Sequence, residues 1–219
     1  MEPLILFTVG LSTGLSGAMI PGPLFLYTVS EAFRSGQSAG IKIALGHLLL
    51  EAGFVALVML GLRDLLGSTA VRTAALGVGR VALIVMGGMI LLRVPRLSLS
   101  RRADVLFRWG PLAGGAFFSL VSPGFLLWWA TIGASVLLRG ALAGTQGILA
   151  VAAGHATADL GWCWLVAWSV ARGRGCCTDR VYRAIMAVIA LSLIVMGIGL
   201  PVGQFGGCLR IDAAQMPCQ

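Results

Sequence analysis

Two histidine–carboxylate pairs stand at matching places in the chain. The pattern Gly-His-x-x-x-acid-x-Gly-aromatic occupies residues 46–54 and recurs at residues 154–162. It contains both histidines of the chain and two of its eight acidic residues, as the pairs His47–Glu51 and His155–Asp159. Because residues four apart lie on the same face of a helix, each histidine can reach its own carboxylate. Such pairs can hold a proton, a substrate amine or a metal ion.

Both pairs lie within long apolar segments, where ionisable side chains are costly. An ionised carboxylate at the centre of a membrane helix costs about 2.5–3.5 kcal/mol, so these groups should face an interior cavity. Burial favours the neutral carboxyl group, whereas a cationic histidine beside it favours the carboxylate. We therefore predict that Glu51 and Asp159 bind a proton or another cation, and that His47 and His155 tune or relay it. The alternative is a structural hydrogen-bonded pair that holds helices together.

The composition is that of a polytopic membrane protein. Hydrophobic residues make up 58% of the 219 residues and charged residues only 11%, whereas about a quarter of the residues in soluble domains are charged. Several apolar runs reach the length of about 20 residues that a helix needs to cross the hydrocarbon core. The net charge of +8 does not indicate nucleic-acid binding, because the basic residues lie mostly in short loops between these runs. The five cysteines have no C-x-x-C or zinc-finger spacing, which argues against a metal or redox scaffold.

The apolar runs predict an all-α membrane protein with six transmembrane helices. Helices are expected because they satisfy their backbone hydrogen bonds within lipid, and the strict alternation typical of a membrane barrel is absent. The predicted segments are residues 3–33, 39–62, 75–93, 111–138, 144–171 and 184–203.

These six helices form two groups of three. We divide the single transmembrane domain, residues 1–219, into repeat 1 (about 3–93), a basic cytoplasmic linker (94–110), repeat 2 (about 111–203) and a tail (204–219). Three crossings are an odd number, so the second repeat must enter the membrane in the opposite orientation. The chain is therefore predicted to contain inverted-topology repeats, which are common in secondary transporters.

The basic residues predict the orientation of the helices. With the N-terminus outside the cell membrane, eleven Lys and Arg residues fall on the cytoplasmic side and five on the outer side. Cytoplasmic loops carry the excess of Lys and Arg in membrane proteins. We therefore expect a multi-pass protein of the cell membrane with both termini outside.

The first helix of each repeat contains a Pro-Gly sequence at the matching place. Proline removes a backbone donor and glycine adds conformational freedom, so each helix should break there and leave carbonyl groups for other helices, water or a ligand. The half-helix after each break directs the positive end of its dipole at the interior, where a substrate carboxylate fits. A simple kink is the alternative. The predicted substrate-binding residues at the breaks are Pro21, Gly22, Pro23, Ser122, Pro123 and Gly124.

Glycines and tryptophans beside these motifs have simpler explanations. Gly46, Gly53, Gly154 and Gly161 flank the histidine–carboxylate pairs, and small residues allow helices to pack closely. The tryptophans at 128–129 follow the second break and either shape the cavity or pack against other helices.

A family resemblance enters at the first break. The run Gly-Leu-Ser-Gly-Ala-Met-Ile-Pro-Gly-Pro at residues 14–23, followed by a G-x-x-x-G loop from Gly36 to Gly40, resembles the LysE/RhtB family of amino-acid exporters. Residues 122–129, Ser-Pro-Gly-Phe-Leu-Leu-Trp-Trp, look like the Asn-Pro segment in the fourth helix of that family.

The resemblance covers about residues 3–203. It implies six helices, export of amino acids or related metabolites from the cytoplasm, and coupling to the proton gradient. Two positions differ from the family pattern: Leu24 stands where a polar residue commonly follows Pro-Gly-Pro, and Ser122 stands where the family has asparagine.

The leading interpretation is a secondary-active, proton-coupled exporter of amino acids or related small metabolites. A divalent-metal exporter of the same superfamily is an alternative, although transition metals usually bind richer His/Cys clusters. A membrane enzyme or thiol-electron carrier would need a constellation such as paired cysteines at the breaks, and the chain has none there. We expect no catalytic residue, no resident metal and no cofactor. The expected partners are a small-molecule substrate, protons, membrane lipid and, as an option, a second copy of the chain, but no nucleic acid.

Overall fold

The computed structural model describes residues 3–20, 22–57, 59–60, 69–97, 110–173, 175 and 177–199. All regular structure in these ranges is helical, as predicted. The elements are α1 (Pro3–Ala18), α2 (Pro23–Ser35), α3 (Ser38–Leu57), α5 (Thr69–Arg93), the 3₁₀ turn η2 (Val94–Arg96), α6 (Gly110–Leu120), α7 (Pro123–Trp128), the π-helical turn η3 (Trp129–Gly133), α8 (Ala134–Ala141), α9 (Gly144–Gly173) and α10 (Asp179–Gly199).

Several of these helices can cross a membrane. Four described stretches are long and apolar enough, at residues 38–57, 76–96, 144–173 and 179–199, and α1 with α2 adds a fifth if that bent pair is one span. These helices make the chain a multi-pass helical membrane protein. The predicted segment 111–138 corresponds to α6, α7, η3 and α8, whose separate pieces are each too short to pass the same length test. Six spans in two inverted repeats therefore stay a prediction.

The largest differences between the helices and the predicted segments are at the N-terminal ends of two helices. α5 begins at Thr69 and α10 at Asp179, several residues before the predicted 75 and 184. Asp179 lies in the first turn of α10, where a negative charge complements the positive end of the helix dipole. The predicted tail 204–219 and most of the linker 94–110 lie outside the described residues.

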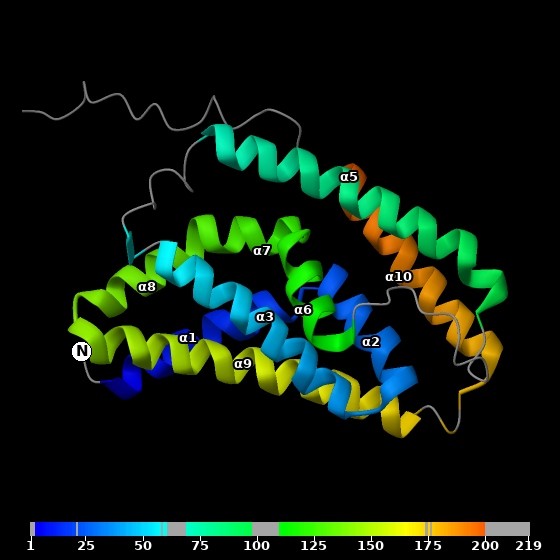
Figure 1. Ribbon diagram of the computed structural model, residues 1–219, viewed down its shortest axis with the longest axis horizontal. Helices are drawn as coiled ribbons and strands as arrows, with labels where there is room; N and C mark the ends of the chain where they lie inside the picture. Colours follow the sequence, from blue (N-terminus) through cyan, green and yellow to red (C-terminus); the bar gives the residue numbers. More distant parts are fainter. Residues whose placement is uncertain are drawn as a thin grey trace, which may run out of the picture.

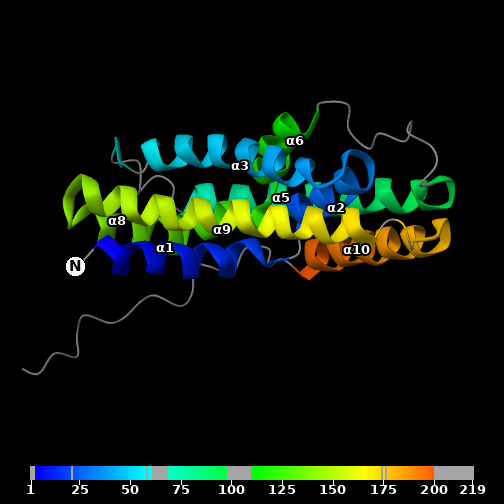
Figure 2. The ribbon, with the colours of Figure 1, turned by 90° about the horizontal axis from the view of Figure 1, so that it is seen from below.

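Long-range packing pairs helices that are far apart in the sequence. α1 lies along α9, α6 packs against α3, and α5 pairs with α10 (Figures 1 and 2). In each half of the chain, the helix before the break therefore packs against a helix of the other half, the one that carries the histidine–carboxylate motif. This exchange brings α3 and α9 into contact at the centre of the molecule.

Glycines allow two of these helix pairs to approach closely. A Cβ atom at Gly46 of α3 would overlap the backbone carbonyl of Leu112 in α6, and one at Gly154 of α9 would overlap the carbonyl of Phe7 in α1. The prediction of close packing is confirmed for these two glycines. It is wrong for Gly53 and Gly161, because no atom of the described residues lies within 4 Å of a Cβ atom at either position. Those two glycines are on the exposed face of their helices.

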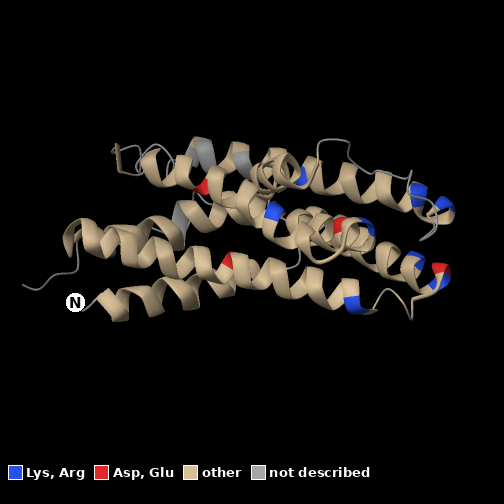
Figure 3. Cartoon of the chain, turned by 60° about the horizontal axis from the view of Figure 1, so that its bottom comes forward, with Lys and Arg blue, Asp and Glu red and all other residues tan. Residues whose placement is uncertain are grey.

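Basic residues gather toward one end of the molecule. In the part of the chain that is described, most Lys and Arg lie toward the end away from the N-terminus (Figure 3). That end holds the last turns of α5 and α9 and the beginning of α10, with Arg93, Arg172 and Arg180. An excess of basic residues at one end is the pattern that positive-inside orientation produces.

Candidate functional site

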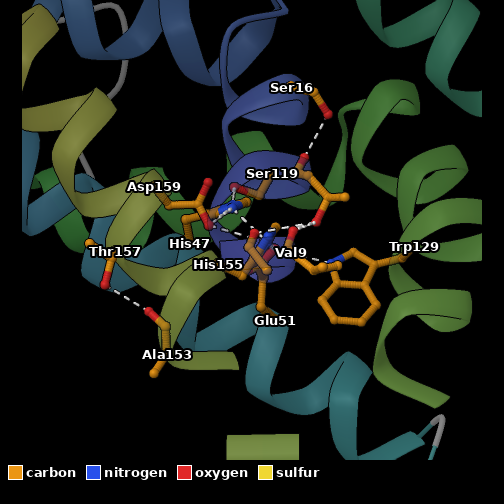
Figure 4. Close-up of polar contacts among 12 residues, drawn as sticks. Val9, Ser16, His47, Glu51, Ser119, Trp129, Ala153, His155, Thr157 and Asp159 are labelled. Carbon is orange, nitrogen blue, oxygen red and sulfur yellow. Dashed lines mark hydrogen bonds and ion pairs between the residues drawn. The ribbon is translucent and has the colours of Figure 1, made fainter. Parts of the chain in front are cut away.

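The two histidine–carboxylate pairs meet at the interface of α3 and α9. His47 and Glu51 come from α3, and His155 and Asp159 come from α9 (Figure 4). All four side chains are buried, with exposed fractions of 7%, 5%, 9% and 4% in that order. We call these four residues the central cluster. The sequence predicted each pair separately, and the fold combines them into one site.

The contacts of the central cluster form a closed ring in which nitrogen and oxygen alternate. His47 Nε2 lies 3.3 Å from Glu51 Oε1 and 3.7 Å from Asp159 Oδ2. His155 Nε2 lies 2.8 Å from the same Glu51 oxygen and 3.2 Å from the same Asp159 oxygen. Each histidine therefore contacts both carboxylates, and each carboxylate contacts both histidines.

Two residues outside the predicted site complete this arrangement. Trp129 Nε1 donates a hydrogen bond to Glu51 Oε1 at 3.1 Å, and Ser119 Oγ lies 2.7 Å from His47 Nδ1. Ser119 was not among the predicted site residues, although a hydroxyl in an apolar helix four residues before a Pro-Gly break was a usable signal. For Trp129 the sequence left open whether it shapes the cavity or packs against other helices; its side chain is buried and bonds Glu51, and it is not among the residues that line the cavity.

The histidine of the second pair has different neighbours. Trp128 stacks on the His155 ring, with centroids 4.6 Å apart and planes at 24°. On another side, α1 approaches so closely that a Cβ atom at Gly14 would lie 2.6 Å from His155 Nδ1. His155 Nδ1 and Asp159 Oδ2 have no hydrogen-bond partner among the described residues. The second pair is thus less completely hydrogen-bonded than the first.

The predicted helix breaks lie beside the central cluster. α1 ends at Ala18 and α2 begins at Pro23, with a bend of 78° between them. α6 ends at Leu120, and α7 begins at Pro123 after an N-cap at Ser122 whose Oγ accepts a hydrogen bond from the Phe125 amide.

The two breaks also face each other. A Cβ atom at Gly22 would lie 3.8 Å from Ser122 Oγ, which is ordinary van der Waals contact. The predicted breaks are therefore present at both places and meet at one point, although Pro21 itself lies outside the described residues. Proline at the first helical position begins each half-helix, because its missing N–H has no partner to lose there.

A cavity of about 160 Å³ connects the breaks with the central cluster. All four cluster residues line it, together with Gly22, Ser122, Pro123 and Gly124 from the breaks and the side chains of Phe125 and Trp128. Pro23 is buried and is not among the lining residues, so the structure does not bring it to the cavity with the others. The walls are mostly apolar, with the polar atoms concentrated at the cluster.

The central cluster can bind protons or a cation. Two ionised carboxylates beside two neutral histidines would give a buried charge of −2, which an apolar interior does not tolerate without compensation. Protons on the histidines or carboxyl groups, an ammonium group or a metal ion can each supply the positive charge. His47, Glu51 and Asp159 offer ligand atoms that all lie within 4.8 Å of one another, which is close enough to share one ion.

We expect Trp129→Phe to destabilise the folded protein by about 1.5–3 kcal/mol, the usual contribution of a hydrogen bond to a charged group. Phenylalanine keeps the ring packed against Phe54, whose centroid is 6.3 Å away, but removes the donor to Glu51. The free energy of unfolding in detergent micelles measures this effect. Trp164→Phe is the matched control, because Trp164 is 42% exposed on α9; equal losses in both variants would contradict the role of the Glu51 hydrogen bond.

A buried polar cluster on a cavity between interrupted membrane helices is an arrangement typical of one class of protein, the membrane transporters. The comparison with protein families names the group more closely: the model of the LysE type translocator matches residues 15–204. The chain belongs to this family. Searches of curated proteins and of solved structures give no match.

Family membership confirms the resemblance read from the first break. Members are translocators, so the chain moves a small-molecule substrate across a membrane and is not an enzyme.

Proposed function

We propose that this translocator exports a small amino acid or a related metabolite from the cytoplasm across the cell membrane, and that protons drive the export. The observation that carries the proposal is the alternating ring of two histidines and two carboxylates at the cavity. A group of this kind can exchange a proton for a cationic substrate group, because either one compensates the buried carboxylates.

The size and lining of the cavity support a small substrate with both polar and apolar parts. A cavity of about 150 Å³ accommodates a molecule the size of benzene, and this one measures about 160 Å³. Phe125, Leu127 and Trp128 give it an apolar wall. Carboxylates at the cluster suit an ammonium group, and the N-terminal ends of the half-helices suit a carboxylate.

The packing of the helices supports six spans in two inverted repeats. α1 packs on α9 as α6 packs on α3, and the third helices of the two halves, α5 and α10, pack on each other. Matching contacts of this kind are expected of a pseudo-two-fold arrangement, with the substrate site at the repeat interface. The basic end of the molecule in Figure 3 favours a cytoplasmic location for that end and an outside location for the N-terminus.

Transport in inside-out membrane vesicles tests the proposed function. In this orientation export appears as uptake into the vesicle, and a lumen more acidic than the medium should drive accumulation of amino acids supplied outside. We expect accumulation to collapse when a protonophore removes the gradient. Uptake that is indifferent to the gradient would contradict proton coupling, and uptake of no amino acid or related metabolite would contradict the substrate class.

Export of a divalent metal ion is the second candidate, because three cluster residues can contact one ion. The same vesicles distinguish the two: the metal alternative requires gradient-dependent uptake of a divalent cation in the absence of amino acids. Two carboxylates and a histidine suit several divalent metals. The mostly apolar cavity next to the cluster favours an organic substrate over a metal ion.

A further inference from the structure

The two histidines of the central cluster differ in what contacts their Nδ1 atoms. His47 Nδ1 lies 2.7 Å from the hydroxyl of Ser119, on the helix α6 that packs against α3. His155 Nδ1 faces Gly14, on the helix α1 that packs in the same way against α9. Glycine has no side chain to offer, so the matching ring nitrogen has no hydrogen-bond partner among the residues described. The duplicated motif is therefore asymmetric at this one contact.

The Ser119 hydroxyl determines where the proton of His47 lies. Ser119 Oγ donates its single hydrogen to the backbone carbonyl of Gly115 at 2.7 Å. With that hydrogen engaged, the oxygen can only accept from His47, so His47 Nδ1 must carry a hydrogen. Ser119 is 1% exposed, so both of its hydrogen bonds are buried.

This assignment has a consequence at the other nitrogen of the His47 ring. In a neutral ring with hydrogen on Nδ1, the Nε2 atom is a lone-pair acceptor. It would then face two further acceptors, Glu51 Oε1 at 3.3 Å and Asp159 Oδ2 at 3.7 Å, with no hydrogen between them. One additional proton on Nε2 converts both repulsive contacts into attractive ones and makes the ring an imidazolium.

His155 needs no additional proton in the same arrangement. Its Nδ1 is not held by a hydroxyl, so a neutral ring can place its hydrogen on Nε2 and donate it to Glu51 Oε1 at 2.8 Å. The contact of 3.2 Å with Asp159 lies on the same side of the ring. With both carboxyl groups ionised, the neutral form therefore satisfies the contacts of His155, whereas the contacts of His47 require the cationic form.

We propose that the coupling proton binds to His47. Ser119 is the positioning residue, because it keeps a hydrogen on Nδ1 and so leaves Nε2 to take the additional proton. The proton is held on His47 Nε2 between the Glu51 and Asp159 carboxylates, while His155 remains a neutral donor. The proposal rests on the proton coupling proposed above and names where that proton binds. The step transfers one proton from a hydronium ion to the Nε2 lone pair, so that one N–H bond forms, one O–H bond of the hydronium ion breaks and a water molecule is left.

The groups that face His47 are few. Within the described ranges, its own helix contributes Glu51, α9 contributes His155 and Asp159, and α6 contributes the uncharged Ser119. From α7 the ring of Phe125 approaches edge-on, with centroids 5.4 Å apart. No titratable group of α6 or α7 lies in contact with the ring in this part of the chain, so the carboxylates are its charged neighbours.

Nitrogen-15 NMR of the ring nitrogens tests the proposal directly, because the chain has only two histidines. The ring shifts distinguish an imidazolium from the two neutral tautomers, and His47→Gln and His155→Gln assign the signals. We expect His47 to carry hydrogen on both nitrogens in the purified full-length protein at neutral pH, and His155 to carry it on Nε2 alone. A neutral His47, or a cationic His155 beside it, would overturn the proposal. This spectrum of the unmodified protein decides the question even if a variant fails to fold.

Variants of Ser119 test its role as the positioning residue. Ser119→Ala removes the acceptor, so His47 can move its hydrogen to Nε2 and become neutral, whereas Ser119→Thr keeps a hydroxyl and should keep the imidazolium. The ratio of proton-driven uptake to substrate exchange should fall about tenfold or more in Ser119→Ala, the factor expected on loss of a hydrogen bond to a charged group. Ser192→Ala is the matched control, because the Ser192 hydroxyl donates to the Ile189 carbonyl of its own helix, α10.

The outcomes separate this inference from the proposed function. Unmodified protein that transports substrate without regard to the proton gradient contradicts the proposed coupling, and the inference falls with it. Proton-driven transport in the unmodified protein together with an unchanged ratio in Ser119→Ala contradicts only the role of Ser119. Rescue by Ser119→Thr in both the ring shifts and the ratio supports it.

Discussion

Glu51→Gln should reduce proton-driven uptake about 100-fold or more in inside-out vesicles. The Oε1 atom of Glu51 accepts from Trp129 and contacts the Nε2 atoms of both histidines, so its negative charge is shared by three donors. Glutamine has nearly the same shape but no charge, and it leaves a cationic histidine buried with one carboxylate fewer. Removing one partner of a buried ion pair costs about 3–5 kcal/mol, which at 1.36 kcal/mol per tenfold corresponds to a factor of about 100 or more.

Asp159→Asn should reduce uptake in the same assay, and the double variant should lose little more than Glu51→Gln alone. The two carboxylates contact the same two histidine nitrogens, and residues in one network are not additive. Asp179→Asn is the control, because it makes the same change at the first turn of α10, away from the cavity. Full activity of the Glu51→Gln, Asp159→Asn double variant would refute a functional role of the central cluster.

Gly46→Ala and Gly154→Ala should each destabilise the protein by about 3 kcal/mol, at the upper end of the usual cost of overpacking. The added methyl group at either position would overlap a backbone carbonyl of the neighbouring helix, and a backbone cannot move aside as a flexible side chain can. α3 must then separate from α6, or α9 from α1. The yield of folded protein and its thermal unfolding in detergent measure the loss.

The matched controls are Gly53→Ala and Gly161→Ala, which make the same change on the same two helices. Among the described parts of the chain, nothing lies within 4 Å of the added atom at either control position. Because alanine favours a helix over glycine by about 0.5–1 kcal/mol, these variants should be as stable as the unmodified protein or slightly more so. Equal destabilisation of all four variants would mean that helix packing at Gly46 and Gly154 is not the cause.

The sequence predicted the site through its chemistry rather than through its geometry. Repetition of a histidine–carboxylate pair in apolar surroundings was enough to identify the residues of the central cluster, because ionisable side chains are costly and therefore rare in membrane helices. Repetition of Pro-Gly was enough to locate both breaks. Neither pattern could predict that Glu51 lies closer to His155, from the other half of the chain, than to its own helical neighbour His47. That distance depends on how α3 and α9 cross.

The residues that the sequence did not identify act through a single contact with a predicted one. Ser119 and Trp129 come from α6 and η3, and each makes one hydrogen bond to the central cluster. A serine or a tryptophan in a membrane helix has several ordinary explanations, so its type and spacing do not reveal such a partner. The difference between Gly53 and Gly46 is of the same kind, since both look alike until the neighbouring helix is in place.

The length of α9 has an electrical consequence. Its 30 residues extend about 45 Å at 1.5 Å per residue, and Asp159 stands near the middle of Gly144–Gly173. Roughly 20 Å of protein therefore separates this carboxylate from either end of the helix. A charge that crosses the whole membrane gains about 2.3 kcal/mol per 100 mV, so a proton that reaches the midpoint from one side senses about half of that voltage. Under the proposed proton coupling, proton binding at the central cluster therefore depends on the membrane potential as well as on the pH on either side.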